Sequence, residues 1–352
     1  MKKDLILTQP DDWHLHLRDG PLMHRVLPFS SALMGRAVIM PNLVPPITTV
    51  AAAFAYRDRI VTALSPIQAF MPLMTLYLHE SMPLSEIKTA KEAGIIAVKL
   101  YPKGATTHSA SGVEDIERTY PLLAMMEKVD LPLLVHGEVV GEHYDIFDRE
   151  AIFIDKILIP LRASFPELRI VLEHVSSEVG AQYVMDGDKY LAATLTPHHL
   201  LMNRNDLLVG GIRPHLYCLP IAKKEQDRRA LVNAATGEKS NRFFLGTDSA
   251  PHPLARKECT CGCAGIFNAP VAIETVAEVF AQAGALNKLE AFIALNGPCF
   301  YRLPINKRKI HLIEEKWQVP DRYGEGDNAL SPFWAGRTLN WRGVLLLSLI
   351  HI

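Results

Sequence analysis

Residues 95–102 read IIAVKLYP, a continuous apolar run that contains one lysine and is closed by a proline. Such a short run without polar alternation is typical of a strand that is buried on both faces, as in a parallel sheet covered by helices. Similar runs, each bounded by turn residues, predict further strands of the same sheet. They are residues 5–8 (LILT), 37–40 (AVIM), 73–78 (LMTLYL), 131–136 (LPLLVH), 169–174 (RIVLEH), 191–196 (LAATLT) and 242–247 (RFFLGT).

Segments with helical spacing of apolar residues lie between these runs, most clearly at 51–64, 113–129, 148–165 and 223–236. Strands that alternate with helices in this way indicate an α/β protein. Eight such units without a break favour a closed (β/α)8 TIM-type barrel over an open doubly wound sheet. No glycine-rich phosphate loop follows the first run, which also weighs against a dinucleotide-binding fold. We therefore expect one barrel domain over residues 1–340.

The composition is that of an ordinary globular protein, with 352 residues, 49% hydrophobic residues, 21% charged residues and a net charge of −1. This charge gives no reason to expect nucleic acid or a membrane surface as a partner. The first apolar run is too short for a signal peptide, and no run approaches the length of a membrane span. The five cysteines, an odd number, favour reduced thiols and a cytoplasmic location.

Three segments do not fit the repeating pattern. The sequence CTCGC at 259–263 lacks the C-x-x-C spacing of zinc knuckles, which favours thiols that line a loop over a structural metal site. The charged stretch 305–316 (INKRKIHLIEEK) is expected to be solvated. Residues 341–352 form an atypical apolar tail, and GVLLLSLIHI at 343–352 is an edge strand, an interface patch or a cloning remnant.

Polar side chains that could bind a ligand follow most of the predicted strands. In a (β/α)8 barrel the C-terminal ends of the strands form the face on which active sites are built. The sequence therefore predicts a site at this face. Its candidates are His14 and His16, Asn42, Lys99, His136, His174, His198 and His199, and Asp248.

His14 and His16 are two residues apart, so in an extended segment both side chains point the same way. Both imidazoles would then face the barrel interior, while Trp13 and Leu15 would face outward. Two neutral imidazoles side by side suit a divalent transition metal. The alternative is two ordinary histidines that are hydrogen-bonded at the surface. Convergence with His136, His174 and Asp248 favours the metal, because buried polar groups without partners are costly.

Lys99 lies in an otherwise apolar strand. Burial of an ammonium group is costly, and such a group tends to lose its charge. Two interpretations remain open. Either the head of the side chain reaches water at the barrel mouth, or the neutral amine has added carbon dioxide to form a carbamate whose two oxygens bridge two cations.

Together these residues give the chain a resemblance to the dihydroorotases of the short bacterial class, in the amidohydrolase superfamily. The resemblance runs from residue 11 to about residue 340 and rests on long motifs that occur in order. They are DDWHLHLRDG (11–20), MPNLVPPITT (40–49), KLYPKGATT (99–107), LLVHGEV (133–139), EHV (173–175), GGIRPHLYCLP (210–220), FLGTDSAPH (244–252) and CGCAGIFNAP (261–270).

The resemblance implies reversible hydrolysis of (S)-dihydroorotate to N-carbamoyl-L-aspartate, a step of UMP biosynthesis, by a cytoplasmic homodimer. It implies two Zn²⁺ ions per subunit, bridged by an N6-carboxylysine at Lys99. Asp248 would also transfer the proton from the attacking water to the leaving nitrogen. The implied metal ligands are His14, His16, Lys99, His136, His174 and Asp248.

The resemblance also implies a set of substrate contacts. Arg18, Asn42 and His252 would hold the substrate carboxylate, and His136 is implied among the substrate-binding residues. Leu219 and Ala264 would contact the pyrimidine ring through their backbones. Thr106 and Thr107 lie in a loop, KGATTHSASG (103–112), that would close over substrate as a lid, with an ordinary surface loop as the alternative.

Two rival functions remain. A hydantoinase would share the metal core but would not need Arg18, Asn42 and His252 together on a carboxylate. A non-catalytic relative that serves as an assembly partner would be expected to have lost metal ligands, and all six ligand positions are present in this chain.

Overall fold

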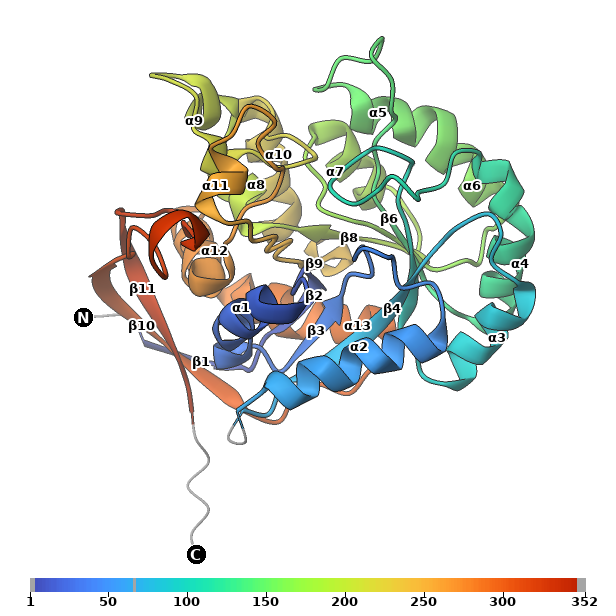
Figure 1. Ribbon diagram of the computed structural model, residues 1–352. Helices are drawn as coiled ribbons and strands as arrows, with labels where there is room; N and C mark the ends of the chain where they lie inside the picture. The colour runs from blue at the N-terminus through green and yellow to red at the C-terminus, as the bar shows by residue number, and fades with distance from the viewer. Residues whose placement is uncertain (1–3, 66–67, 347–352) are drawn as a thin grey trace, which may run out of the picture.

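The computed structural model describes residues 4–65 and 68–346, and its centre is an eight-stranded parallel barrel (Figure 1). Each strand pairs with the next one in the chain, and helices cover the outside of the sheet. This confirms the predicted (β/α)8 fold. The barrel strands are β2 (Asp11–Leu15), β3 (Arg36–Ile39), β4 (Met71–Tyr77), β5 (Ala97–Leu100), β6 (Leu133–Val135), β7 (Ile170–Leu172), β8 (Leu191–Leu195) and β9 (Phe243–Leu245).

The barrel closes where β2 runs beside the residues that follow β9. The backbone N–H of Asp248 donates to the carbonyl of His14 at 2.8 Å, and the N–H of His16 donates to the carbonyl of Ser249 at 3.2 Å. Closure therefore brings the two ends of the barrel sequence together at the C-terminal ends of the strands.

The four helical segments that the sequence predicts most clearly are all present, with shifted ends. Residues 51–64 correspond to α2, 113–129 to a 3-10 turn followed by α4, 148–165 to α5 and α6 joined by a π-helical turn, and 223–236 to α10. The helices are α1 (Gly20–Leu33), α2 (Val50–Ala63), α3 (Leu84–Glu92), α4 (Tyr120–Val129), α5 (Arg149–Phe153), α6 (Ile159–Ser164), α7 (Glu178–Met185), α8 (Pro197–Leu201), α9 (Arg204–Leu208), α10 (Glu225–Thr236), α11 (Leu254–Lys257), α12 (Ala272–Gln282) and α13 (Asn296–Tyr301). The π-helical turns are Ile154–Leu158 and Ala291–Leu295, and the 3-10 segments are Ile116–Thr119, Pro214–Leu216, Ser240–Arg242, Ala269–Val271, Leu286–Lys288 and Gly326–Asn328.

The first barrel strand is not the predicted one. Residues 5–8 lie in β1 (Asp4–Thr8), outside the barrel, and the first barrel strand is β2, which begins with two aspartates. These carboxylates are buried with partners. Arg36 makes a bidentate contact with Asp11, at 3.0 and 2.5 Å, and Asp12 accepts from the backbone and hydroxyl of Thr247 at 2.8 and 2.6 Å. Because β2 begins with these two polar residues, it does not form an apolar run in the sequence.

The prediction that Trp13 faces outward is also wrong. Its ring belongs to the apolar cluster inside the barrel and stacks on Tyr301 with ring centroids 4.5 Å apart. Leu15 does pack in the outer cluster, between strands and helices. The register of β2 against β3 shifts between Asp12 and Leu15, so simple two-residue alternation does not hold at this point.

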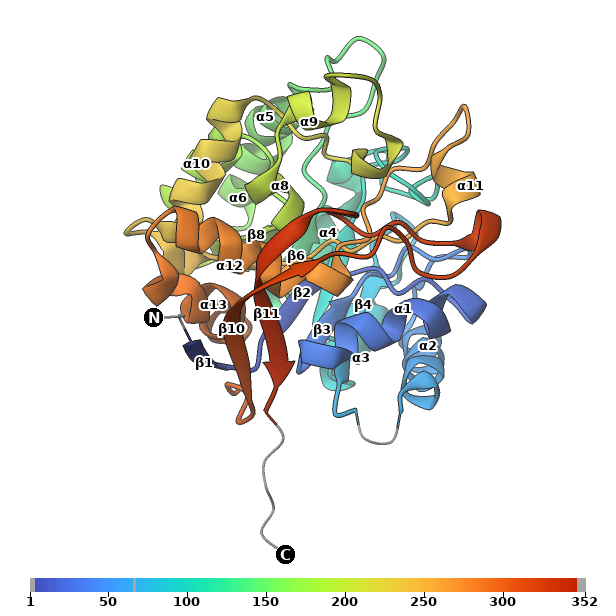
Figure 2. The same ribbon diagram turned by 90° about the vertical axis from the view of Figure 1, so that its left-hand side faces the viewer.

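A second, antiparallel sheet lies beside the barrel, with β10 (Lys309–Gln318) between β1 and β11 (Thr338–Leu345) (Figure 2). The prediction that residues 305–316 form a solvated region holds at residues 305 and 307–309, which are exposed, and it is wrong at Ile310 and Leu312 of β10, which are fully buried. β11 crosses the boundary that the sequence suggested at residue 340. Among the described residues it pairs only with β10, which makes residues 343–345 part of an edge strand. Residues 347–352 of the predicted tail lie outside the described residues.

Within the described part of the chain, no helix combines the length and the apolar character that crossing a membrane requires.

Candidate metal and substrate site

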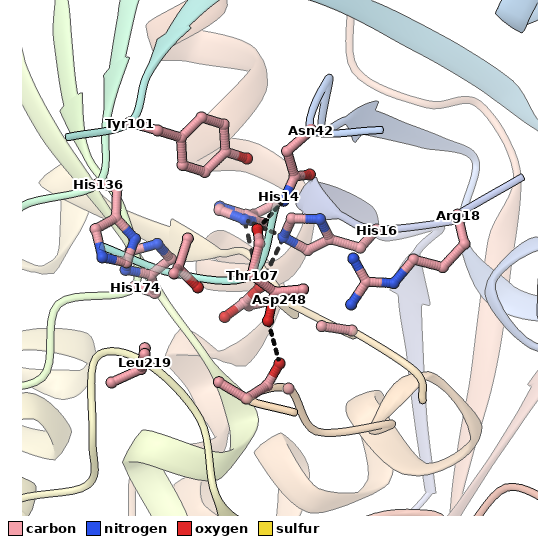
Figure 3. Close-up of a pocket in the computed structure, with 14 residues that line it drawn as sticks. His14, His16, Arg18, Asn42, Tyr101, Thr107, His136, His174, Leu219 and Asp248 are labelled. Atoms are coloured by element: carbon pink, nitrogen blue, oxygen red, sulfur yellow. Dashed lines mark hydrogen bonds and ion pairs between the residues drawn. The ribbon is translucent and has the colours of Figure 1, made fainter. Parts of the chain in front are cut away.

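A pocket opens at the C-terminal ends of the barrel strands, where closure places β2 beside the residues after β9 (Figure 3). Most of the site residues expected from the sequence line it. Lys99 lies beneath the pocket, and His252 contacts the lining residue Arg18. The pocket is lined by His14, His16, Arg18, Asn42, Tyr101, Thr106, Thr107, His136, His174, Leu219, Asp248, Ala250, Ala264 and Gly265.

Three donor atoms converge at one side of this pocket. The Nε2 atoms of His14 and His16 are 3.1 Å apart, and Oδ1 of Asp248 lies 3.4 Å from the first and 3.1 Å from the second. All three side chains are buried. Donor atoms on a tetrahedral zinc ion, at roughly 2.0–2.2 Å from the metal, have about this mutual spacing. The group therefore has the geometry of a metal site.

The protonation of His14 supports the same conclusion. Its Nδ1 contacts Oε2 of Glu173, so the neutral ring carries its proton there and leaves a lone pair on Nε2. Burial lowers the pKa of His14 and lowers the pKa values of His16 and His174 well below the ordinary value. The lone pair on Nε2 of His14 then faces Oδ1 of Asp248, which is also an acceptor, and a cation between them satisfies both atoms.

Lys99 lies below this group, fully excluded from solvent. Its Nζ donates to Oε2 of Glu173 at 2.5 Å, the same carboxylate that contacts His14. The interpretation in which the head of Lys99 reaches water is therefore wrong, because the side chain has no exposed area. Burial lowers the pKa of Lys99, and the neighbouring Glu173 raises it again in part.

His136 and His174 form the opposite side of the pocket, with ring centroids 4.8 Å apart. Nε2 of His136 is held by Oε2 of Glu138 at 2.8 Å, in a pair that is fully buried. This leaves Nδ1 as the nitrogen of His136 that is available to a ligand. Nδ1 of His174 is also buried, and it has no hydrogen-bond partner among the described residues. A second group of nitrogen donors therefore lies beside the first.

Arg18 marks the end of the pocket away from His136. Its guanidinium donates from Nε to the carbonyl of Pro251 at 3.3 Å and lies 2.9 Å from Nε2 of His252. Among the described residues no carboxylate forms a salt bridge with it, although the side chain is buried. Burial and the adjacent Arg18 hold the pKa of His252 far below its usual value, so this imidazole is neutral. The end of the pocket therefore has an unneutralised positive charge.

The predicted lid loop lies over the pocket. The amide of Asn42 donates to the carbonyl of Thr107 at 3.1 Å, and the hydroxyl of Thr107 donates to the carbonyl of Ala264 at 3.1 Å. Ser109 ties the loop internally through its contacts with Thr106 at 2.9 and 2.6 Å. The loop is thus docked on two of the residues that the sequence assigned to substrate binding.

Strained backbone is concentrated around this pocket. Arg18, Asp248, His174 and the loop residue His108 all have positive φ, at 60°, 45°, 42° and 57°. A positive φ is uncommon for non-glycine residues and persists only where the surrounding structure imposes it. The hydrogen bond from Tyr56 to the carbonyl of Arg18 is one such restraint.

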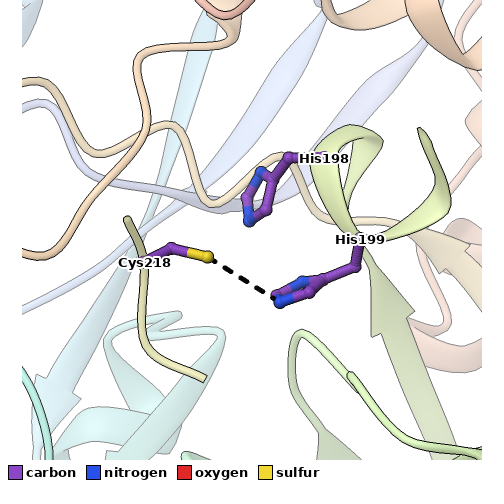
Figure 4. Close-up of side chains that lie close together, drawn as sticks. All are labelled: His198, His199 and Cys218. Carbon is purple, nitrogen blue, oxygen red and sulfur yellow. Dashed lines mark hydrogen bonds between the residues drawn. The ribbon is translucent and has the colours of Figure 1, made fainter. Parts of the chain in front are cut away.

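His198 and His199, which also follow a predicted strand, do not line the pocket. They lie beside Cys218 in a separate buried group whose donor atoms are within 4.8 Å of one another (Figure 4). Both nitrogens of His199 have protein partners, Thr196 at 2.9 Å and the carbonyl of Pro220 at 2.9 Å. His199 therefore has no nitrogen free for a metal ion, whereas Nε2 of His198 is buried without a hydrogen-bond partner among the described residues.

The CTCGC segment behaves as the sequence suggests. Cys259 and Cys261 are exposed, with their sulfur atoms 3.8 Å apart, on the loop that follows α11. Within residues 4–65 and 68–346, no third His, Cys, Asp or Glu atom completes a compact ligand group with them.

Sequence reasoning missed Glu138, Glu173 and Tyr101. The two glutamates contact the histidines of the site. Tyr101 lines the pocket, and its buried hydroxyl has no hydrogen-bond partner in the described part of the chain. A signal was present in the sequence, because Glu138 lies two residues after His136 and Glu173 directly precedes His174. Carboxylates commonly orient metal-binding imidazoles through the second ring nitrogen.

Comparison with known proteins places the site in a family context. The family model "Amidohydrolase family" matches residues 6–307. A dihydroorotase of Erwinia tasmaniensis is 54% identical over 348 residues, which cover 97% of this chain and 99% of the relative. A dihydroorotase of Variovorax paradoxus is 54% identical over 342 residues, with 97% and 99% covered.

Solved structures agree with the sequence relatives. Dihydroorotase from Campylobacter jejuni has a TM-score of 0.89 at 37% identity and covers 97% of this chain and 98% of its own. Dihydroorotase from Saccharomyces cerevisiae, solved in complex with 5-fluoroorotic acid, has a TM-score of 0.90 at 33% identity and covers 98% and 100%. An L-hydantoinase from Arthrobacter aurescens has a TM-score of 0.81 at 15% identity over 98% of this chain and 83% of its own, which shows a shared fold alone.

Proposed function

The chain belongs to the dihydroorotases of the amidohydrolase family, and we propose that the pocket at its barrel mouth interconverts (S)-dihydroorotate and N-carbamoyl-L-aspartate with the help of two zinc ions. The observation that carries this proposal is the position of the buried Arg18, which has no carboxylate partner within residues 4–65 and 68–346, beside the converging donor atoms of His14, His16 and Asp248. A substrate with one carboxylate and one cyclic amide fits both features.

The proposed zinc ligands fall into two groups. His14, His16 and Asp248 would hold one ion, His136 and His174 the other, and a carboxylated Lys99 would bridge them. When bound, such a pair supplies Lewis acidity that polarises an amide carbonyl and lowers the pKa of water from about 15.7 toward 7. Glu138 and Glu173 would orient the ring nitrogens of His136 and His14 from behind.

Asp248 would also carry the proton. Its carboxylate would take a proton from the attacking water and deliver it to the ring nitrogen that leaves the carbonyl carbon. The backbone at Asp248 is held on one side by the carbonyl of His14 and on the other by Thr247, which Asp12 fixes through two hydrogen bonds. This rigid support would keep the carboxylate at a constant position while the proton moves.

Arg18, Asn42 and His252 would hold the substrate carboxylate. The guanidinium offers a planar fork that suits two carboxylate oxygens, and the neutral His252 lies directly beside it. His136, and the backbones of Leu219 and Ala264, would contact the ring. The lid residues Thr106 and Thr107 would exclude bulk water from the pocket.

The distinguishing experiment compares two substrates. We expect hydrolysis of dihydroorotate, while a hydantoin that lacks a carboxylate should turn over at least about 10³-fold less efficiently, because a buried charge left unpaired is costly. Comparable kcat/KM values for the two would favour a hydantoinase. Complete absence of turnover with both, in protein that retains its zinc, would favour the non-catalytic assembly partner.

The proposal extends to the setting of the protein. The five unpaired cysteines support a reducing compartment, and we propose the cytoplasm. The family resemblance supports a homodimer, and sedimentation equilibrium that gives the monomer mass at working concentration would contradict it.

A further inference from the structure

Lys257 is a buried cation that the proposed reaction does not use. It ends α11, its side chain is buried, and no carboxylate among the described residues forms a salt bridge with it. Its Nζ instead donates to three backbone carbonyls, those of Tyr217 at 3.0 Å, Cys263 at 2.8 Å and Gly265 at 2.7 Å. An ammonium group has three N–H donors, so each one is used.

These three carbonyls flank the two backbone positions proposed to contact the ring. Cys263 and Gly265 are the immediate neighbours of Ala264, and Tyr217 lies two residues before Leu219. A direct bond from the N–H of Gly265 to the carbonyl of Tyr217, at 3.0 Å, joins the same two segments. Lys257 therefore ties together both strips of backbone that border the pocket.

The carbonyl of Ala264 is not among the partners of Lys257. It accepts from the hydroxyl of Thr107 at 3.1 Å and lies 3.1 Å from Nε2 of His252. With the carbonyls of residues 263 and 265 held by Lys257, the carbonyl of Ala264 is directed to the lid loop.

Burial of the Lys257 ammonium group costs free energy, which its three hydrogen bonds offset. Burial lowers the pKa of Lys257 to about 8, so the ammonium form still predominates at pH 7. An ammonium group buried without a counter-ion is unfavourable unless its donors are satisfied. Gly265 adds to the restraint, because a Cβ there would meet the carbonyl oxygen of Ala250 at 2.5 Å.

We propose that Lys257 is a positioning residue for the substrate ring, one that fixes the backbones at Leu219 and Ala264 and the carbonyl on which the lid docks. Lys257 does not touch substrate. The inference rests on the proposed dihydroorotase function, because it assigns a role within that same pocket.

The test uses three variants of the full-length, zinc-loaded protein. Lys257→Met keeps the length of the side chain but removes the donors, Lys257→Arg keeps donors, and Arg256→Met removes an exposed charge from the preceding residue of α11. We expect Lys257→Met to raise the KM for dihydroorotate at least tenfold and to weaken orotate binding equally, with kcat within about threefold of the parent. Lys257→Arg should have an intermediate KM, and Arg256→Met should match the parent.

Several results would overturn the inference. A KM within twofold of the parent in Lys257→Met would do so, as would a fall in kcat at unchanged KM or an equal change in Arg256→Met. If Lys257→Met does not fold, the KM of Lys257→Gln is compared with that of the parent instead. We expect a threefold rise, and an unchanged KM would contradict the inference. Failure of the proposed function is distinct, since the parent itself would then not hydrolyse dihydroorotate.

Discussion

Nζ of Lys99 donates to Oε2 of Glu173 at 2.5 Å, and both side chains are fully excluded from solvent. The same oxygen contacts Nδ1 of His14, so one carboxylate holds two of the proposed metal-binding residues. A carboxylated lysine keeps one N–H on its nitrogen. The contact with Glu173 is therefore compatible with the modification that we propose, and it would restrict the rotation of the resulting carbamate.

This pair predicts a stability effect in the metal-free protein. Lys99→Met leaves Glu173 buried without its cation, and the loss of one partner of a buried pair costs about 3–5 kcal/mol. The double variant Lys99→Met/Glu173→Gln should recover a large part of that loss, because the neutral amide can still accept from His14. Urea unfolding of the parent, both single variants and the double variant measures the coupling. Additive effects of the two substitutions would contradict the prediction.

Glu138 is expected to set metal affinity through His136. Its carboxylate holds Nε2 of the imidazole, and removal of such a partner typically lowers metal affinity about 10–100-fold. Glu138→Ala should therefore release zinc at lower chelator concentration than the parent. The matched control is Glu142→Ala, an exposed glutamate in the same segment. Equal zinc retention in both variants would show that Glu138 does not affect zinc affinity.

Asp248→Asn should lose turnover by about 10²–10⁴-fold, the usual contribution of a general acid–base group. The amide retains an oxygen near His14 and His16 but cannot carry the proton. Steady-state kinetics must be paired with metal analysis, so that loss of zinc is not mistaken for loss of the proton carrier. A zinc-loaded Asp248→Asn protein with near-parental kcat would exclude the shuttle role.

Arg18→Lys should raise the KM for dihydroorotate with a smaller change in kcat. Lysine keeps the positive charge but loses the planar fork and the contact with the carbonyl of Pro251. The expected effect is about tenfold or more in KM, equivalent to one lost charge-assisted hydrogen bond. Unchanged binding of dihydroorotate would mean that Arg18 does not hold its carboxylate.

Glu274 predicts a pH dependence of stability away from the site. Burial raises its pKa from 4.5 to about 7, and its Oε1 accepts from the N–H of Gly343 in β11 at 3.1 Å. Between those two pH values the folded state binds more protons than the unfolded chain, so stability falls as pH rises through this window. Glu274→Gln should therefore gain up to about 3 kcal/mol over the parent at pH 8 and much less at pH 5.

Urea unfolding at both pH values measures this difference, and Glu92→Gln, an exposed glutamate on α3, is the control. A constant difference between Glu274→Gln and the parent at pH 5 and pH 8 would contradict the raised pKa of Glu274.

The sequence predicts the barrel well where the strands are continuous apolar runs, as at β5 and β8. A strand that is buried on both faces consists mostly of apolar residues, so it can be recognised in the sequence. It fails at β2, whose first residues, Asp11 and Asp12, are tolerable only because Arg36 and Thr247 reach them from distant segments. The same applies to β10, whose burial alternates because only one face of the small sheet is covered.

The candidate site divides in the same way. Donor-bearing residues at strand ends, such as His14 and His136, can be found from their positions alone. The residues that hold them cannot, because their roles depend on contacts across the sequence. Glu173 and Lys99 are 74 residues apart, and Lys257 and Tyr217 are 40 residues apart.

The central claim is that cations make this buried cluster of imidazoles and carboxylate stable and active. Anomalous diffraction at the zinc absorption edge, on crystals of fully active protein, tests it most directly. We expect two peaks, one among His14, His16 and Asp248 and one between His136 and His174, with density for an added carboxylate on Lys99. An active crystal without anomalous signal at the first position would contradict the account.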